Sequence, residues 1–223
     1  MSEPSRDAPR LVLASRSPRR ARLLREAGYA FVQLASPFDD AGVIDARAGD
    51  AAREVAVELA LRKARALAAT LEPGRVVLGA DTLCMGVDGT LLGQPATREA
   101  AAAMLRGFRG RTHAMVTGVS LVVTGDGGRV DAFADRAEVT IGALPDAELE
   151  AYLDTEAWRG KAGGYNLVDR QAAGWPIEVA GDPTTVVGLP MARLAAALAK
   201  MGVGVGAGSQ GSRGSQGSQG MRR

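Results

Sequence analysis

The sequence is poor in the residues on which several broad classes of function depend. Its single cysteine, Cys84, excludes an intramolecular disulfide and fits a reducing compartment. His113 is the one histidine, so Cys and His side chains cannot assemble a zinc site, and any metal must be held mainly by oxygen atoms, as Mg²⁺ or Mn²⁺ is. Aromatic residues make up only 4%, which disfavours the base-stacking surfaces of single-strand-binding proteins. We therefore expect no stable nucleic-acid partner.

Long apolar segments are also missing. The first nine residues are polar, and no run approaches the ~18 apolar residues that a membrane helix needs. We expect a cytoplasmic protein that has no membrane partner.

The net charge of +2 comes from the C-terminal end of the chain. Arg213, Arg222 and Arg223 lie in a segment without acidic residues, and without them 24 basic residues stand against 25 acidic ones. The rest of the chain is nearly neutral, so phosphate binding must depend on a local cluster of cations.

With 223 residues, of which 46% are hydrophobic, the chain can bury one domain core. We predict a disordered N-terminus over 1–9, one domain over 10–202 and a disordered Gly/Ser/Gln tail over 203–223. Local patterns predict a mixed α/β fold. The expected strands are 11–14, 31–34, 76–80, 112–124 and 130–141, the last two forming a hairpin, and the expected helices are 18–28, 51–71, 97–107, 145–153 and 190–200.

The first expected strand runs directly into a helix start that is rich in hydroxyl and guanidinium groups. Ser17 reads as the N-cap, Pro18 as the first helical residue, and Arg19 and Arg20 follow. Backbone N–H groups and arginines at a helix N-terminus form an anion site. On motif shape alone, a solvated and well-capped helix start explains the same residues equally well.

Asp81 ends an otherwise uncharged strand pattern, where open α/β sheets place residues that face ligands. A carboxylate there can hold Mg²⁺ or orient an attacking water. Asp39 and Asp40 form a second acidic pair that could share the metal. The alternative for all three is a carboxylate that only caps a turn.

Lysine is scarce, with three lysines against twenty-four arginines. Lys63, on an expected helix, and Lys161, in a Gly-rich loop, are compact cations suited to a phosphate oxygen. The alternative is a solvated side chain. For His113, with no second His or Cys nearby, we expect a hydrogen-bonded structural role.

Six blocks, in this order, resemble the Maf family of nucleoside triphosphate pyrophosphatases over residues 11 to 200. The order is more specific than any single motif. The blocks are 13–20 (Leu-Ala-Ser-Arg-Ser-Pro-Arg-Arg), 59–66, 79–82 (Gly-Ala-Asp-Thr), 110–113 with 117–118, 161–165 (Lys-Ala-Gly-Gly-Tyr), and 181–182 with 187–190.

The resemblance implies an elongated mixed β-sheet flanked by helices, like that of the inosine triphosphatases, with two lobes and a central cleft. It implies hydrolysis of a nucleoside triphosphate, including a non-standard or modified one, to the monophosphate and pyrophosphate with a divalent metal. A homodimer is one expected assembly. The implied catalytic residues are Asp81 as proton acceptor and Lys63; the implied substrate-binding residues are Ser15, Ser17, Arg19, Arg20, Gln94 and Lys161; and the implied metal ligands are Asp81 and Asp40.

Two positions depart from the family pattern. Gln94 stands where the family usually has lysine, and Val168 stands where the pyrimidine-preferring branch has glutamine. Two hypotheses therefore stay open: an active pyrophosphatase, and a nucleotide-binding regulatory protein with weak or lost turnover. Asp81 favours the enzyme, because loss of activity would more often remove the carboxylate itself.

Overall fold

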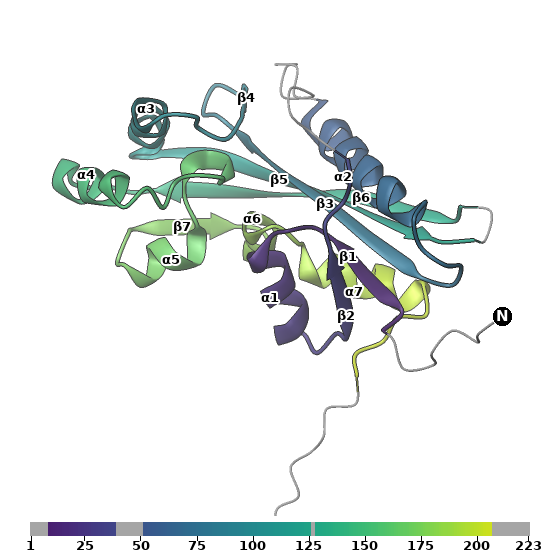
Figure 1. Cartoon of the computed structure of the whole chain (residues 1–223). Helices are drawn as coiled ribbons and strands as arrows, with labels where there is room; N and C mark the ends of the chain where they lie inside the picture. Colours follow the sequence, from purple (N-terminus) through teal and green to yellow (C-terminus); the bar gives the residue numbers. More distant parts are fainter. Residues whose placement is uncertain (1–8, 39–50, 126–127, 207–223) are drawn as a thin grey trace, which may run out of the picture.

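The structure is a computed structural model that describes residues 9–38, 51–125 and 128–206. It contains a seven-stranded sheet with helices on both faces (Figure 1). The strands are β1 (Leu11–Ala14), β2 (Phe31–Leu34), β3 (Val76–Met85), β4 (Leu91–Leu92), β5 (Arg111–Val123), β6 (Val130–Ile141) and β7 (Ile177–Ala180). The helices are α1 (Pro18–Glu26), α2 (Ala52–Ala68), α3 (Arg98–Phe108), α4 (Asp146–Asp154), α5 (Leu167–Ala172), α6 (Pro183–Val187) and α7 (Met191–Lys200), with a 3-10 turn at Ala162–Gly164.

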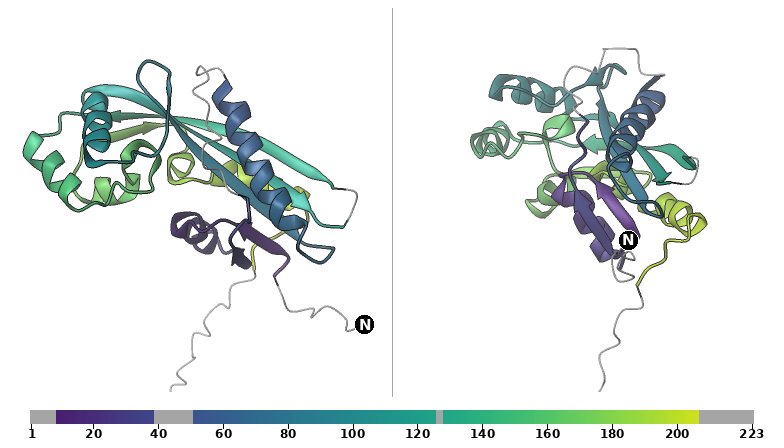
Figure 2. Two further views of the ribbon diagram at one scale, coloured as in Figure 1. Left: turned by 45° about the horizontal axis from the view of Figure 1, so that its top comes forward. Right: turned by 45° about the vertical axis from the view of Figure 1, so that its right-hand side comes forward.

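The sheet is mixed, as the sequence predicts. Its strand order is β2-β1-β3-β5-β6-β7, and β4 pairs with β3 outside this path. β1 runs parallel to β2 and β3, whereas the other pairings are antiparallel. The long β5–β6 hairpin extends through the whole molecule, with α3 and α4 near one end and α2 and α7 toward the other (Figures 1 and 2).

Side-chain alternation along β5 separates the two faces of the sheet. Val116 and Val122 pack with residues of α2, whereas Val119 and Leu121 pack with α7 on the other face. This is the period of two that a strand imposes on its side chains. The same alternation governs β3 and decides where its polar residues point.

Helix α2 approaches the sheet unusually closely, because glycines and alanines form the contact. A Cβ on Gly79 of β3 would lie 2.1 Å from the carbonyl oxygen of Ala60, and one on Gly118 of β5 would lie 2.2 Å from that of Ala56. No side chain fits at either glycine without a shift of the backbone. The close approach sets the height of α2, and so of Lys63, above the sheet.

Most expected elements are confirmed within two or three residues. The prediction for 76–80 was too short, because pairing with β5 continues to Met85, and the expectation that Asp81 ends its strand is wrong. Local sequence patterns did not predict β7, α5 or α6. Val203, assigned to the tail, is buried in the core beside α7.

Within residues 9–38, 51–125 and 128–206, no helix has both the length and the apolar character required to cross a membrane.

Candidate active site

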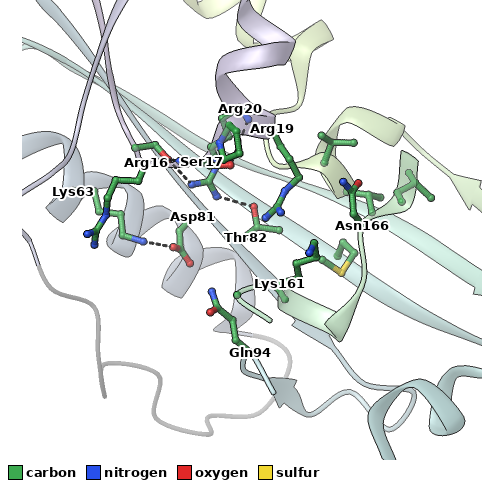
Figure 3. A pocket seen from close by; sticks show the side chains of 18 of the residues that line it. Arg16, Ser17, Arg19, Arg20, Lys63, Asp81, Thr82, Gln94, Lys161 and Asn166 are labelled. Carbon is green, nitrogen blue, oxygen red and sulfur yellow. Dashed lines mark hydrogen bonds and ion pairs between the residues drawn. The ribbon is translucent and has the colours of Figure 1, made fainter. Parts of the chain in front are cut away.

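A pocket of about 440 Å³ lies at a gap in the sheet. β1 pairs with β3 only as far as Leu13 and Leu78, and β4 pairs with β3 only from Cys84 onward. Among the described residues, positions 79–83 of β3 therefore have no strand partner on this edge. Asp81 and Thr82 lie in this gap, so side chains from both faces of the sheet reach one pocket (Figure 3).

The loop between β1 and α1 forms one wall of the pocket. Ser17 caps α1 by accepting the N–H of Arg20 at 3.5 Å, and Pro18 begins the helix. The Oγ of Ser15 accepts the N–H of Ser17 at 3.1 Å, and Gln33 of β2 donates to the carbonyl oxygen of Ser15 at 2.8 Å. These bonds fix the helix start and confirm Ser17 as its N-cap, while the anion site there stays a prediction.

The guanidinium of Arg20 donates hydrogen bonds to a backbone carbonyl and to two hydroxyl groups. Its Nε donates to the carbonyl oxygen of Gly188 at 3.0 Å, and its Nη1 donates to Ser15 Oγ at 3.3 Å. Its Nη2 donates to Thr82 Oγ1 at 3.0 Å (Figure 3). Since these acceptors engage three different nitrogens, the plane of the guanidinium is fixed.

Arg19 and Lys161 supply two further cations to the same pocket. Burial lowers the pKa of Arg19, although Asp169 opposes the effect. Burial also lowers the pKa of Lys161, and the nearby charge of Arg19 lowers it further. The Nζ of Lys161 donates to the carbonyl oxygen of Ala157. An anion bound beside both cations would relieve their mutual repulsion and stabilise their charged forms.

Lys63 and Asp81 form a short ion pair across the gap. Lys63 Nζ lies 2.5 Å from Asp81 Oδ1, with side-chain exposures of 15% and 11% (Figure 3). The pair joins α2 to β3, and the backbone carbonyl of Lys63 accepts the Ser36 hydroxyl at 2.9 Å. The Lys63–Asp81 pair places a carboxylate that can act as an acid or base beside a cation inside the pocket.

The charge of the pocket wall is strongly positive. Among its described residues, Asp81 is the one carboxylate, against five cations. Five cations around one pocket favour the binding of a polyanionic ligand, such as the phosphates of a nucleotide. Other lining residues offer apolar contact of the kind that suits a base or a sugar. The cations are Arg16, Arg19, Arg20, Lys63 and Lys161, and the apolar residues include Met115, Leu167, Val186 and Val187.

All but one of the residues that the resemblance singled out line this pocket, although their roles stay predictions. Asp40 lies outside the described residues. Thr82, Tyr165 and Asn166 also line the pocket, and no sequence pattern had given them a role in it. The predicted residues that line the pocket are Ser15, Ser17, Arg19, Arg20, Lys63, Asp81, Gln94 and Lys161.

His113 is buried and supports the pocket wall from behind. Its Nε2 lies 2.8 Å from the hydroxyl of Tyr165, and its ring stacks on Phe108 at a centroid distance of 3.9 Å. Burial lowers its pKa to about 4. The structural role expected for this histidine is confirmed.

The donor set fits a divalent metal that is bound largely through a substrate. In the described part of the chain, no three His, Cys, Asp or Glu side chains meet in a way that would hold a metal by themselves. Mg²⁺ is commonly held by one or two carboxylates together with substrate phosphates. Asp81 can supply such a carboxylate beside the phosphate-binding cations.

Comparison with known proteins gives a consistent set of relatives. A dTTP/UTP pyrophosphatase of Symbiobacterium thermophilum is 40% identical over 90% of this chain and 98% of the relative. One of Moorella thermoacetica is 42% identical over 88% of this chain and 97% of the relative. Among solved structures, the nucleoside-triphosphatase / dITP/XTP pyrophosphatase of Mycobacterium abscessus is 18% identical, with a TM-score of 0.38 over 60% of this chain and 75% of that chain. The family profile described as Maf-like protein matches residues 10–201, and the chain belongs to this family.

Proposed function

We propose that the protein hydrolyses a nucleoside triphosphate to the monophosphate and pyrophosphate, with dTTP and UTP as its substrates. The observation that carries the proposal is the Lys63–Asp81 pair within a pocket whose other charged residues, among those that the structure describes, are all cations. The substrate assignment comes from relatives about 40% identical, named dTTP/UTP pyrophosphatases.

The triphosphate binds along the N-terminus of α1. The backbone N–H groups of the helix start and the guanidinium groups of Arg19 and Arg20 take the phosphate oxygens, and Lys161 approaches from the opposite loop. Phosphoryl transfer depends mainly on such positioning and electrostatic stabilisation.

Asp81 accepts the proton of the attacking water. The water oxygen forms a bond to the α-phosphorus as the bond from that phosphorus to the α,β-bridging oxygen breaks, and pyrophosphate leaves with the electron pair. Lys63, 2.5 Å from Asp81, orients the carboxylate and stabilises charge that develops on the phosphoryl oxygens. Asp81, together with Asp40, would hold a Mg²⁺ or Mn²⁺ that supplies Lewis-acid charge to the phosphates.

Pyrimidine preference does not depend on Val168 in this proposal. Val168 is 41% exposed and is not among the residues that line the pocket, so the base contacts other groups. The cytoplasmic location and the homodimer also stay proposals.

The second candidate is a nucleotide-binding regulatory protein. Gln94 favours it, because a neutral amide lines the pocket where the family usually carries a lysine. Asp81 and Lys63 argue against it, because binding alone needs no carboxylate beside the phosphates.

The test is pyrophosphate release from dTTP, UTP, CTP and the purine triphosphates, with Mg²⁺ or Mn²⁺. We expect turnover of dTTP and UTP, and a loss of about 100-fold or more in Asp81→Asn. Asp146→Asn is the matched control, since its side chain is 74% exposed on α4 and it does not line the pocket. Nucleotide binding without pyrophosphate release would support the regulatory protein, and near wild-type turnover in Asp81→Asn would refute the mechanism.

A further inference from the structure

Behind Arg20, the side chains of Thr82 of β3 and Thr117 of β5 form a row that ends on the backbone carbonyl of Thr185 of α6. We propose that the hydroxyl groups of Thr82 and Thr117 form an oriented pair that positions Arg20 for phosphate, so that Thr82 acts on the substrate through Arg20 and not by direct contact. This inference rests on the proposed function in one respect only, the assignment of Arg20 as a phosphate ligand.

The direction of the hydrogen bonds is fixed at the inner end of the row. Thr117 Oγ1 lies 2.7 Å from the carbonyl oxygen of Thr185, and both residues are fully buried. A carbonyl oxygen can only accept, and a hydroxyl carries one hydrogen. The hydrogen of Thr117 is therefore committed to Thr185.

This commitment determines the next bond. Thr82 Oγ1 and Thr117 Oγ1 are 3.0 Å apart, and Thr117 has no second hydrogen to give. Thr82 must donate to Thr117, which leaves only lone pairs on Thr82 Oγ1. Those lone pairs accept the Nη2–H of Arg20 at 3.0 Å. All three bonds run in one direction, from the guanidinium to α6.

The orientation changes the role of Thr82. A hydroxyl that lines a phosphate pocket is ordinarily assigned as a donor to phosphate oxygens. Here the hydrogen points away from the pocket, toward buried Thr117, and lone pairs repel a phosphate oxygen while they attract a guanidinium. Thr82 and Thr117 are thus positioning residues.

Helix α6 anchors Arg20 twice. The row ends on Thr185 of α6, and Gly188, directly after α6, accepts the Nε–H of Arg20 at 3.0 Å. Gly188 has φ +125°, a backbone conformation that favours glycine, and a Cβ there would also lie 3.1 Å from Arg20 Nε and crowd the guanidinium. Asp135 of β6 accepts the Thr185 hydroxyl at 2.6 Å and fixes this end of α6 to the sheet.

The experiment compares Thr117→Val, which keeps the side-chain shape without the hydroxyl, with Thr117→Ser, which keeps the hydroxyl without the methyl group. We expect Thr117→Val to raise KM for dTTP roughly 10-fold with a smaller change in kcat, because Thr82 is no longer oriented by Thr117 to accept the N–H of Arg20. Thr117→Ser should stay within about 2-fold of wild type although its core loses a methyl group and its Tm falls. If Thr117 only stabilised the fold, KM would rise in each variant in proportion to its loss of Tm, including in Thr117→Ser. That result would overturn the inference.

Two further measurements keep the inference falsifiable. Calorimetric binding of inorganic tripolyphosphate needs no turnover, and we expect it to weaken in Thr117→Val by a similar factor. In an Arg20→Ala background, Thr117→Val should add little to the loss. If wild type releases no pyrophosphate, the proposed function fails while the binding comparison still decides this inference. Unchanged tripolyphosphate binding in Thr117→Val, or in Thr82→Val should the first variant fail to fold, would overturn it.

Discussion

Asp81 and Thr82 are neighbours on β3, yet their side chains leave the strand on opposite faces. Asp81 meets Lys63 of α2, and Thr82 meets Arg20 of α1. Both reach one pocket because the described residues place no strand against this stretch of β3 between the ends of β1 and β4. At the scale of single residues, the site therefore depends on strand alternation at a gap in the sheet.

Gln94 is the position where an added positive charge should strengthen binding of the triphosphate. Gln94→Lys places an ammonium in the pocket wall, and we expect KM to fall about 5-fold at low salt, since an exposed phosphate contact contributes roughly 1 kcal/mol. The gain should shrink at high salt through screening. Gln94→Met, of similar length and no charge, is the control in steady-state kinetics. An unchanged or higher KM at low salt would mean that another cation already serves the phosphates.

Burial of His113 should make the stability of the protein depend on pH. Burial lowers the pKa of His113 to about 4, whereas an unfolded histidine titrates near 6.5. As pH falls between these values, the unfolded chain binds a proton that the folded chain does not, so stability present above about pH 6.5 is lost. We expect the free energy of unfolding to fall by about 2 kcal/mol between pH 7 and pH 5. Urea titrations over this pH range should show that the free energy of unfolding of His113→Gln falls less with pH than that of wild type. An equal fall in both proteins would contradict a lowered pKa for His113.

At the scale of secondary-structure elements, the contact between α2 and the sheet decides whether Lys63 reaches Asp81. The helix presents small residues, Ala56 and Ala60, to glycines on two neighbouring strands. The 2.5 Å ion pair depends on this contact, because α2 carries one partner and β3 the other.

A methyl group at Gly118 should separate the two elements. Its Cβ would lie 2.2 Å from the backbone carbonyl of Ala56, so Gly118→Ala must displace α2, and we expect a loss of stability of about 1–3 kcal/mol together with lower kcat. Gly107→Ala is the control: a Cβ at this position on α3 meets nothing within 4 Å, and alanine favours a helix. Thermal melts and pyrophosphate release measure both effects. A Gly118→Ala protein as stable and active as wild type would contradict the close contact.

Local patterns predicted most of these elements, while the site depends on contacts distant in sequence. The strand at 11–14 and the cap at Ser17 follow from short-range chemistry and are confirmed. The extension of β3 through Asp81 depends on pairing with β5, about forty residues away, and periodicity cannot show it. The support of Arg20 by Gly188 joins residues 168 positions apart, so no local signal could reveal it.

At the scale of the whole molecule, the segment after α7 returns to the N-terminal part of the sheet. Val203 is buried in the cluster that contains Leu11 and Leu24, and Arg10 donates to the carbonyl oxygen of Gly202 at 3.4 Å. The N–H of Gly206 donates to the carbonyl oxygen of Gly28 at 3.0 Å. Residues 203–206 thus belong to the folded unit and pack against β1 and the C-terminal end of α1.

Two truncations separate the contribution of this folded segment from that of residues 207–223. A chain that ends at Gly206 should keep the Tm and activity of the full chain, because residues 207–223 are almost entirely Gly, Ser, Gln and Arg and offer little apolar surface to bury. A chain that ends at Gly202 also loses Val203, which is only 7% exposed. Burial of a valine contributes about 1.5 kcal/mol, so Tm should fall by roughly 3–6 °C in a domain of this size. Calorimetry of the three chains under one set of conditions measures the difference. Equal Tm values for the two truncated chains would show that Val203 does not stabilise the fold, and a lower Tm for the chain ending at Gly206 would show that the segment beyond it binds the domain.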